Sequence, residues 1–466
     1  MAREKKRKGK SGKGTQRSDR DIDVKLVPTV EFLHEHITES LCDNVFNGVR
    51  TRERQRKWTL FALARFWLAV ILKPPTSLGQ LLEQTRQYDP RGVLPQVAAS
   101  SESFYQKCKV FSSSFFMTLY QGFIESILPK APAAYCQEVG YLRERFTDVL
   151  VIDGSRLDKV AHRLKLFWSE EAAILPGCVT AVYDLFRGIA THLWFDSDAA
   201  KAEHKRGVKA IECLREGTLL LGDRLYCTIK MFGALAKNNC FGLFRRNKTV
   251  TITKIRLLSK FKNGKETVED WLVNAGKGKN AVELRMIVLK KQRTTYEAIT
   301  NVLDPKKLSA RDVIALYPLR WTVERLFYDL KVVLNLKRFY AANPNAVAMQ
   351  VYAAAMVHAA FRIAQADVAR RVELPPEELS PRKLFPFLAL VSIKLIEARF
   401  RFKQTCDVNP GVELREPNWD NDGDTIVSLR SIRVQRRSTK RKKRKFSPER
   451  RKWKSVPKID GTEKLT

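Results

Sequence analysis

The sequence predicts an α/β protein in which a helical region precedes a sheet and a basic segment lies at each end. Three observations predict it. Helical periodicity dominates residues 25–145, short apolar runs of strand length follow from residue 146, and Lys and Arg are concentrated at the termini. With 466 residues, the chain is long enough for two or three domains and a sizeable core.

The charge is strongly basic and unevenly distributed. The 85 Lys and Arg residues outnumber 50 acidic residues, for a net charge of +35. Residues 1–20 carry +7 and residues 430–458 carry +14. This balance favours a polyanionic partner, meaning nucleic acid or an anionic surface. We interpret residues 1–24 and 416–466 as flexible basic tails that bind phosphates without reading sequence. A solubilising tail or a ribosomal-type extension is the alternative.

Residues 25–145 are predicted to be mostly helical and possibly to bind DNA. The candidate helices are Thr29–Leu41, Arg54–Leu72, Leu78–Gln87 and Ser103–Leu128. No helix pair has the clear character of a recognition helix, so a scaffold packed on the next domain is the alternative. The most apolar run, Trp58–Leu72, is too short to span a bilayer. We therefore expect no membrane association.

The cysteines and the N-terminus indicate a cytoplasmic protein. None of the eight cysteines forms a C-x2-C pair or has zinc-finger spacing to a histidine. Reduced, mostly buried thiols are therefore expected. The N-terminus is basic with no apolar segment after it, so no signal peptide is expected.

From residue 146 the pattern changes to short apolar strands that alternate with helices. The predicted strands are Thr147–Ile152, Gly177–Asp184, Gly188–Trp194, Thr218–Leu221 and Cys240–Phe244, with the second and third forming a hairpin. Helices are predicted at Lys201–Leu214 and Tyr226–Asn238. The resulting order of three strands, helix, strand, helix and strand is that of a ribonuclease-H-like core.

Two aspartates are predicted at the ends of apolar strands. Asp153 follows Val-Leu-Val-Ile, and Asp223 follows Leu-Leu-Leu-Gly. Each has a plain structural alternative, because Asp-Gly suits a turn at Asp153 and an aspartate suits a helix cap at Asp223. The nearest acidic rivals are Asp158, Asp184 and Asp312.

The most informative stretch is YPLRWTVERLFYDLK, which begins at Tyr317. On an α-helix of about 100° per residue, Tyr317, Arg320, Glu324 and Lys331 share one narrow face, while leucines and valines form another. Pro318 suits the first position of such a helix. An ordinary amphipathic helix with a solvated charged face is the alternative.

The spacing Tyr-x2-Arg-x3-Glu-x6-Lys, with two aspartates upstream, resembles the signature of the IS-four (insertion sequence four) family of DDE transposases. The resemblance covers roughly residues 100–370. It implies a ribonuclease-H-like catalytic domain at residues 146–370 with a β-rich insertion at about 247–305, and a C-terminal helical region at 371–415. This chain has Leu225 where the family often has a small residue.

Within the insertion, the apolar pattern predicts strands at Thr249–Ser259, Val268–Val273 and Val282–Lys290. A plain extension of the sheet is the alternative to a separate insertion. Beyond the signature, helices are predicted at Ala346–Ala366 and at Phe387–Phe402, directly after Pro386. His358 lies among apolar residues and is interpreted as a core histidine.

The resemblance also implies a chemistry for the named residues. Asp153, Asp223 and Glu324 would be the catalytic residues and would bind two Mg²⁺ ions, for which Mn²⁺ substitutes. The DNA-binding residues would be Tyr317, Arg320 and Lys331.

The implied function is that of a DNA transposase. It would cut the ends of an insertion sequence and join them to target DNA by metal-dependent hydrolysis and transesterification. The implied partners are inverted-repeat ends, target DNA and a second copy in a synaptic homodimer, and the implied location is the nucleoid. A domesticated transposase-derived DNA-binding protein and a ribonuclease-H-like endonuclease without strand transfer are the alternatives.

Overall fold

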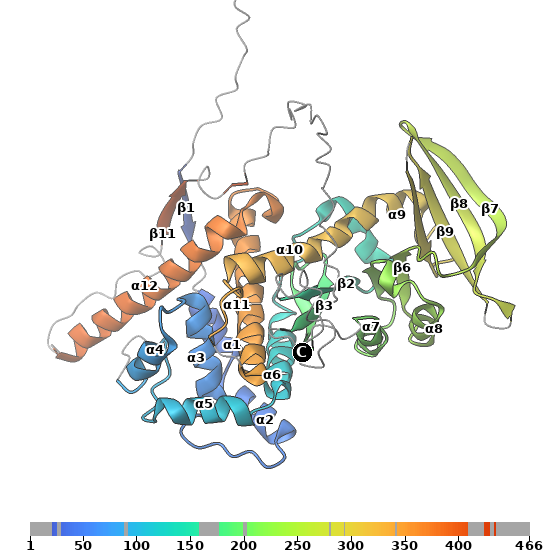
Figure 1. The fold of residues 1–466 in the computed structure, drawn as a ribbon. Coiled ribbons are helices and arrows are strands. Elements are labelled where there is room, and N and C mark those ends of the chain that lie inside the picture. The colour runs from blue at the N-terminus through green and yellow to red at the C-terminus, as the bar shows by residue number, and fades with distance from the viewer. Residues whose placement is uncertain are drawn as a thin grey trace, which may run out of the picture. The chain divides into compact units, whose positions relative to one another are not determined.

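A nine-stranded mixed sheet is the central feature of the computed structural model (Figure 1). The described residues are 21–25, 29–87, 92–157, 177–198, 203–278, 281–292, 294–340, 343–408, 424–428 and 433–434. Those up to Arg433 belong to one compact unit. Strand order across the sheet is β4-β3-β2-β5-β6-β10-β9-β8-β7.

The N-terminal region is helical, as predicted, with shorter helices than expected. Its helices are α1 (Thr29–His36), α2 (Glu39–Val49), α3 (Leu60–Leu72), α4 (Leu78–Gln84), α5 (Ser101–Val110) and α6 (Ser113–Ile127), followed by the 3-10 helix η1 (Gln137–Glu144). Side-chain caps explain two boundaries. Thr38 accepts a hydrogen bond from Leu41 N and starts α2, and Thr59 accepts one from Ala62 N and starts α3.

The first five strands and the two helices between them occur in the predicted order. They are β2 (Val149–Arg156), β3 (Cys178–Asp184), β4 (Ala190–Asp196), α7 (Glu203–Ile211), β5 (Leu219–Gly222), the 3-10 turn η3 (Arg224–Tyr226), α8 (Ile229–Lys237) and β6 (Phe241–Arg245). The hairpin of β3 and β4 is confirmed, and β2 pairs antiparallel with β3. In contrast, β2, β5 and β6 run parallel.

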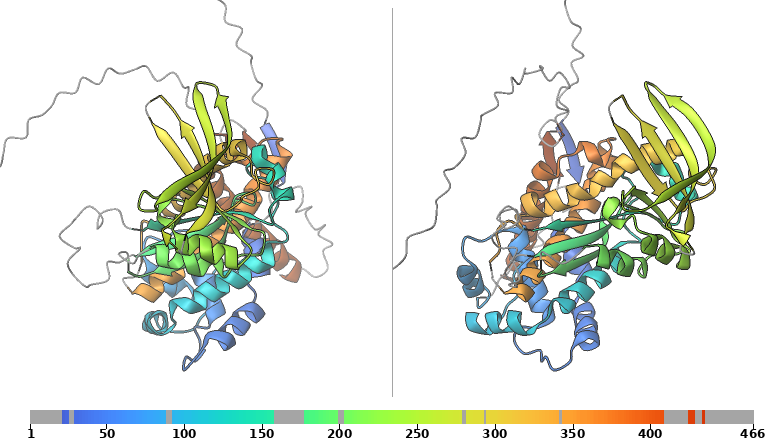
Figure 2. Two further views of the ribbon diagram at one scale, coloured as in Figure 1. Left: turned by 90° about the vertical axis from the view of Figure 1, so that its right-hand side faces the viewer. Right: turned by 45° about the vertical axis from the view of Figure 1, so that its right-hand side comes forward.

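The β-rich insertion extends the same sheet. It comprises β7 (Ile252–Asn263), β8 (Glu266–Ala275), β9 (Val282–Lys290) and β10 (Thr295–Thr300). Strand β10 was not predicted, yet it joins the insertion to the core because Ile299 pairs with Phe244 of β6. The insertion is therefore built as an extension of the core sheet, and Figure 2 shows these long strands rising beyond the helices.

Alternating residues of the core strands face two separate apolar cores. Leu150 and Ile152 pack with Ile211 of α7 and Phe232 of α8. Val149 and Val151 face the opposite core, which also contains α6 and the C-terminal helices. The helical region and the sheet therefore share one large core.

Helices complete the C-terminal part of the described chain. They are α9 (Ala310–Leu316), η5 (Tyr317–Trp321), α10 (Thr322–Tyr328), η6 (Asp329–Val333), α11 (Pro344–Arg371), the 3-10 turn η7 (Pro376–Glu378) and α12 (Pro381–Val408). Among the described helices, α11 alone is long and apolar enough to cross a membrane, but 94% of that window is buried. It is therefore a core helix, and its His358 is buried as interpreted.

Two boundaries inferred from composition and from proline are wrong. Helix α12 begins at Pro381 and contains Pro386, because burial of Leu384, Phe385 and Leu388 outweighs one missing hydrogen bond. Residues 21–25 and 424–428, which we placed near or within the tails, form β1 (Asp21–Lys25) and β11 (Asp424–Ser428), an antiparallel pair. The remaining tail residues, apart from 433–434, lie outside the described residues.

Candidate active site

The two predicted aspartates lie next to each other in the sheet. Ile152 of β2 pairs with Gly222 of β5, so Asp153 and Asp223 follow at the same register on neighbouring parallel strands. Both side chains have the parity of residues that face the larger core, where η5 and α10 lie. One detail differs from the prediction. Strand β2 continues beyond Asp153 to Arg156, because β3 keeps pairing with it after β5 has ended.

The signature segment is helical but is not one regular α-helix. Residues Tyr317–Trp321 form a 3-10 helix, Thr322–Tyr328 an α-helix and Asp329–Val333 a π-helix. The helical run also starts earlier, in α9, so Pro318 is not its first residue. Because a 3-10 helix rotates about 120° per residue and a π-helix rotates less than an α-helix, the calculation at a constant angle fails.

Arg320 joins the signature segment to the first aspartate. Its Nη1 lies 3.3 Å from Oδ2 of Asp153, and Arg320 is only 5% exposed. The other carboxylate oxygen of Asp153 accepts a hydrogen bond from Gly154 N at 2.9 Å. The guanidinium also lies 4.5 Å from the ring of Trp321, which is 57% exposed. The alternative of a solvated charged face is therefore wrong for Arg320, which is buried against β2.

Lys331 holds the same strand farther along. Its Nζ donates to Ser155 Oγ at 2.7 Å and to the carbonyl oxygen of Arg156. The lysine is buried, and it comes from the π-helix. Arg320 and Lys331 therefore both reach β2 despite the changes in helix type, and together they bracket the segment that begins at Asp153.

Tyr317 makes the equivalent contact to the second strand. Its hydroxyl donates to the carbonyl oxygen of Gly222 at 3.4 Å, directly before Asp223. Its ring packs 5.1 Å from that of Tyr296 on β10. Burial raises the pKa of the Tyr317 hydroxyl, and the Asp223 carboxylate adds to that rise against the lowering effect of Arg320.

Glu324 is the exposed member of the predicted set, on α10. Partial burial raises the pKa of its carboxyl, Arg320 lowers it, and the negative charge of Asp223 raises it further. Glu324 is therefore within electrostatic reach of both Asp223 and Arg320. The three carboxylates lie near the same face of the sheet, with a guanidinium among them.

The rival aspartates have structural roles where they are described. Asp184 is buried, and its Oδ1 accepts hydrogen bonds from Phe186 N and Arg187 N in the β3–β4 turn. Asp312 forms the capping box of α9 with Ser309. Asp158 lies outside the described residues.

The carboxylates do not converge on one point. Within the described ranges, no group of three His, Cys, Asp or Glu side chains is close enough to hold a metal ion. The donor set nevertheless suits a divalent cation, because carboxylate oxygens are the ligands that Mg²⁺ prefers and because Asp223 and Glu324 carry like charges in mutual reach.

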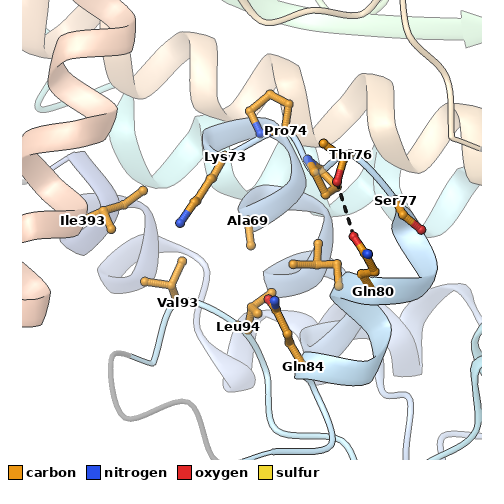
Figure 3. A pocket seen from close by; sticks show the side chains of 12 residues that line it. Ala69, Lys73, Pro74, Thr76, Ser77, Gln80, Gln84, Val93, Leu94 and Ile393 are labelled. Atoms are coloured by element: carbon orange, nitrogen blue, oxygen red, sulfur yellow. Dashed lines mark hydrogen bonds between the residues drawn. The ribbon is translucent and has the colours of Figure 1, made fainter.

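A cavity in the helical region is a weaker candidate for chemistry. It has a volume of about 290 Å³ and lies between α3, α4 and Ile393 of α12 (Figure 3). The Thr76 hydroxyl donates a hydrogen bond to Gln80 Oε1 there at 3.3 Å. Lys73 is the sole charged side chain in the described lining. The cavity therefore lacks the paired acid and base groups of a catalytic site.

Sequence reasoning missed two residues beside the carboxylates. Arg245 ends β6 and follows Phe244, which pairs with Gly222, so it occupies the register position next to Asp223. Tyr296 lies on the unpredicted strand β10 and supports Tyr317. The apolar run that ends at Phe244 indicated that Arg245 lies at the end of a strand. Which residue lies beside Arg245 in the sheet depended on strand order, which the run does not show.

Comparison with known proteins agrees with this arrangement. Residues 145–359 match the family described as "Transposase DDE domain". A protein of Synechocystis sp., named "Putative transposase for insertion sequence element IS4SA", is 26% identical over 155 residues, which cover 32% of this chain and 42% of that protein. A Sinorhizobium fredii protein named "Putative transposase y4zB" is 29% identical over 157 residues, which cover 32% and 44%. The matches span less than half the length of these relatives.

Residues 145–359, slightly less than half of the chain, are thus similar to the DDE domain of transposases. The match and the names of the two relatives support the resemblance to IS4-type DDE transposases seen in the Tyr-x2-Arg-x3-Glu-x6-Lys spacing.

Proposed function

We propose that this protein is a DNA transposase that cuts the ends of an insertion sequence and joins them to target DNA. Its catalytic carboxylates are Asp153, Asp223 and Glu324. The observation that carries the proposal is the adjacency of Asp153 and Asp223 on paired parallel strands, inside the segment that matches the DDE domain. The strand order β4-β3-β2-β5-β6 supports a ribonuclease-H-like core.

Domains of this family use divalent metal ions. We assign two Mg²⁺ ions, for which Mn²⁺ substitutes, to Asp153, Asp223 and Glu324. The support is the oxygen donor set and the like-charge effect of Asp223 on Glu324, which a bound cation would relieve. When bound, such ions stabilise negative charge on the attacking and leaving oxygens of a phosphodiester.

The residues around the carboxylates have positioning roles in this proposal. Arg320 pairs with the first aspartate, Lys331 holds β2 two to three residues beyond it, and Tyr317 holds the carbonyl directly before the second aspartate. Such contacts keep carboxylates in place before substrate arrives. We also assign DNA contacts to these three residues, because two of them bring positive charge beside the carboxylates.

The reaction has two phosphoryl-transfer steps. In the first, water loses a proton as its oxygen bonds to phosphorus at the element's end, the phosphorus–O3′ bond breaks, and the released 3′-oxygen takes up a proton to give a free 3′-hydroxyl. In the second, that hydroxyl loses its proton as its oxygen bonds to a target phosphorus, and the displaced target 3′-oxygen takes up a proton. The exchange of one phosphodiester for another in the second step needs no external energy source.

The proposed partners are inverted-repeat ends, target DNA and a second copy of the chain in a homodimer, and we place the protein at the nucleoid. Support for DNA comes from the net charge of +35, because cations that neutralise phosphates release counterions. Support for an insertion sequence as the substrate comes from the name of the Synechocystis relative.

The test is incubation of the full-length protein with the DNA that flanks its reading frame, Mg²⁺ and a supercoiled plasmid. We expect a nick at the element's boundary and then covalent joining to the plasmid. Cutting without joining would favour the endonuclease, and binding without cutting would favour the DNA-binding protein. The Glu324→Gln variant serves as the inactive control.

A further inference from the structure

A basic hollow lies beside the proposed carboxylates, at the end of β6. Its volume is about 270 Å³, and its lining includes Arg224, Arg245 and Lys248. We call these three residues the β6 cluster. All three are exposed, and Arg224 directly follows Asp223 in the chain. The hollow is therefore continuous in sequence with the proposed site.

Sheet register puts this cluster in line with the carboxylates. Ile152, Gly222 and Phe244 pair across the three parallel strands. The next residues are Asp153, Asp223 and Arg245, so a guanidinium continues the row of the two aspartates. Neighbouring strands are about 4.8 Å apart, so the Arg245 backbone lies about one strand spacing from that of Asp223.

All three side chains of that row belong to one face of the sheet. Leu221 and Leu243 precede Asp223 and Arg245 by two residues and point into the larger core, as Val151 does before Asp153. Because side chains alternate along a strand, Asp153, Asp223 and Arg245 share the face on which η5 and α10 lie.

Among the described residues, no ion pair within 4 Å neutralises the positive charge of the β6 cluster. Arg246 in the same lining pairs with Glu297 at 2.9 Å. In the described part of the chain, the ion pairs within 4 Å include none that involves Arg224, Arg245 or Lys248. Three cations therefore surround one hollow whose single acidic group is already paired, which is the electrostatic setting of an anion site.

The Arg245 side chain is also linked to the signature segment through two aromatic rings. Its guanidinium lies 5.9 Å from the ring centre of Tyr296, and that ring packs against Tyr317. Burial has the largest effect on the pKa of the Tyr317 hydroxyl and raises it, whereas the positive charge of Arg245 lowers it. The cation is therefore within electrostatic reach of a residue that contacts the strand of Asp223.

We propose that the β6 cluster binds a backbone phosphate of the DNA strand that is cut, one or two nucleotides from the cleaved bond. This rests on the proposed function and adds a binding site to it. Successive phosphates of one strand rise by about 3.4 Å along the helix axis. Arg245 lies about one strand spacing from Asp223, and its side chain adds a further reach. It can therefore bind a phosphate next to the cleaved bond but not a remote one.

The test measures binding of end DNA by the full-length protein in EDTA, where no cutting takes place. Probes carry a single uncharged methylphosphonate at each position near the boundary. We expect one position, one or two nucleotides from the cut, to weaken binding by wild type but not by Arg245→Ala. The same variant should lower the salt dependence by about one unit of log-log slope.

Three further variants test the assignment. Arg245→Lys keeps the charge and should keep most of the salt-dependence slope. Lys248→Ala should lower that slope, as Arg245→Ala does. Lys237→Ala removes an exposed cation from the end of α8, before β6 begins, and should leave both readouts unchanged. Melting temperatures check that each variant is folded.

The proposal is overturned if every methylphosphonate weakens DNA binding by the same factor in wild type and in Arg245→Ala. It is also overturned if the coupled phosphate lies more than three nucleotides from the boundary, or if Lys237→Ala acts like Arg245→Ala. Failure here would leave cleavage by the carboxylates untouched. Conversely, normal cutting by the carboxylate variants would refute the catalytic assignment while the phosphate coupling persisted.

Discussion

Arg320 lies 3.3 Å from Asp153, a residue 167 positions earlier in the chain, and both side chains are largely buried. The pair joins the signature segment to the strand of the first aspartate. A buried carboxylate needs such a partner, because removal of an ion from water is costly. We therefore expect that replacement of this arginine, four residues before Glu324, affects both stability and cleavage.

We predict that Asp153→Asn, Asp223→Asn and Glu324→Gln each reduce cleavage by at least about 100-fold, equivalent to about 3 kcal/mol of transition-state stabilisation. These substitutions keep side-chain size and remove charge, so DNA binding and fold should persist. The measurement is nicking of end DNA in Mg²⁺, with gel-shift binding as the control. Near-normal nicking by any variant removes that residue from the proposed metal site.

Arg320→Ala should slow cleavage and also destabilise the protein. Loss of the guanidinium leaves Asp153 with less compensation, and we expect a cost of about 1–3 kcal/mol in unfolding free energy. Arg325→Ala is the matched control, because Arg325 is an exposed arginine next to Glu324 on the same helix. Urea unfolding and single-turnover nicking are measured for both variants. Equal behaviour of the two would show that the buried pair has no special role.

Lys331→Ala should weaken the complex with the cleaved end and slow the chemistry, while metal affinity stays nearly unchanged. The lysine bonds Ser155 and the carbonyl of Arg156, so its loss loosens β2 just beyond Asp153. Metal affinity is read from Mn²⁺ titration of cleavage rate. A large rise in the Mn²⁺ concentration needed would mean that Lys331 acts directly on the metal site, contrary to expectation.

Deletion of residues 435–466 should lower non-specific DNA affinity and flatten its salt dependence. That segment holds fourteen basic and three acidic residues. Truncation at this point keeps Arg433, which pairs with Glu378. Filter binding from low to moderate salt measures the slope. An unchanged slope would show that this tail does not contact DNA.

Glu269 on β8 should make the insertion sensitive to acid. A hydrogen bond from Lys290, with further help from Trp271 and Lys260, lowers the pKa of Glu269 to about 2. Because the folded pKa lies below the ordinary value of 4.5, the stabilisation is present above pH 4.5 and is lost as pH falls toward 2. Both lysines are about half exposed, so we expect Glu269→Gln to cost only about 1 kcal/mol at neutral pH.

The check is the unfolding free energy of wild type and Glu269→Gln across that pH range. The difference between them should shrink as pH falls from 4.5 to 2. Glu283→Gln, on neighbouring β9, is a control carboxylate with no resolved ion pair in the described chain. A difference that stays constant with pH would mean that packing, not ionisation, explains the effect.

Local pattern was enough to predict the strands that carry Asp153 and Asp223 and the helical segment that carries Glu324. Apolar runs of strand length identify β2 and β5 because burial on both faces demands them. The spacing from Tyr317 to Lys331 was enough to predict the similarity to DDE transposases, since residue types at fixed intervals are a property of the chain itself.

Strand β10 and the helix types of the signature segment depended on tertiary contacts. The segment Thr295–Thr300 is short and contains the charged residue Glu297. It forms a strand because β6 pairs with it on one side and β9 on the other. The π-helix at Asp329–Val333 lies where Lys331 reaches β2. Neither partner is near in sequence, so no local pattern predicts these features.

The sequence by itself determined which residues are candidates for the chemistry and which elements they end or begin. Tertiary structure alone decided that Arg320 is buried on Asp153 instead of exposed on a solvated face, and that Arg245 comes next to Asp223. The physical reason is that strand order and register bring together residues far apart in the chain. A helical wheel or a strand pattern describes only which side of its own element a residue occupies.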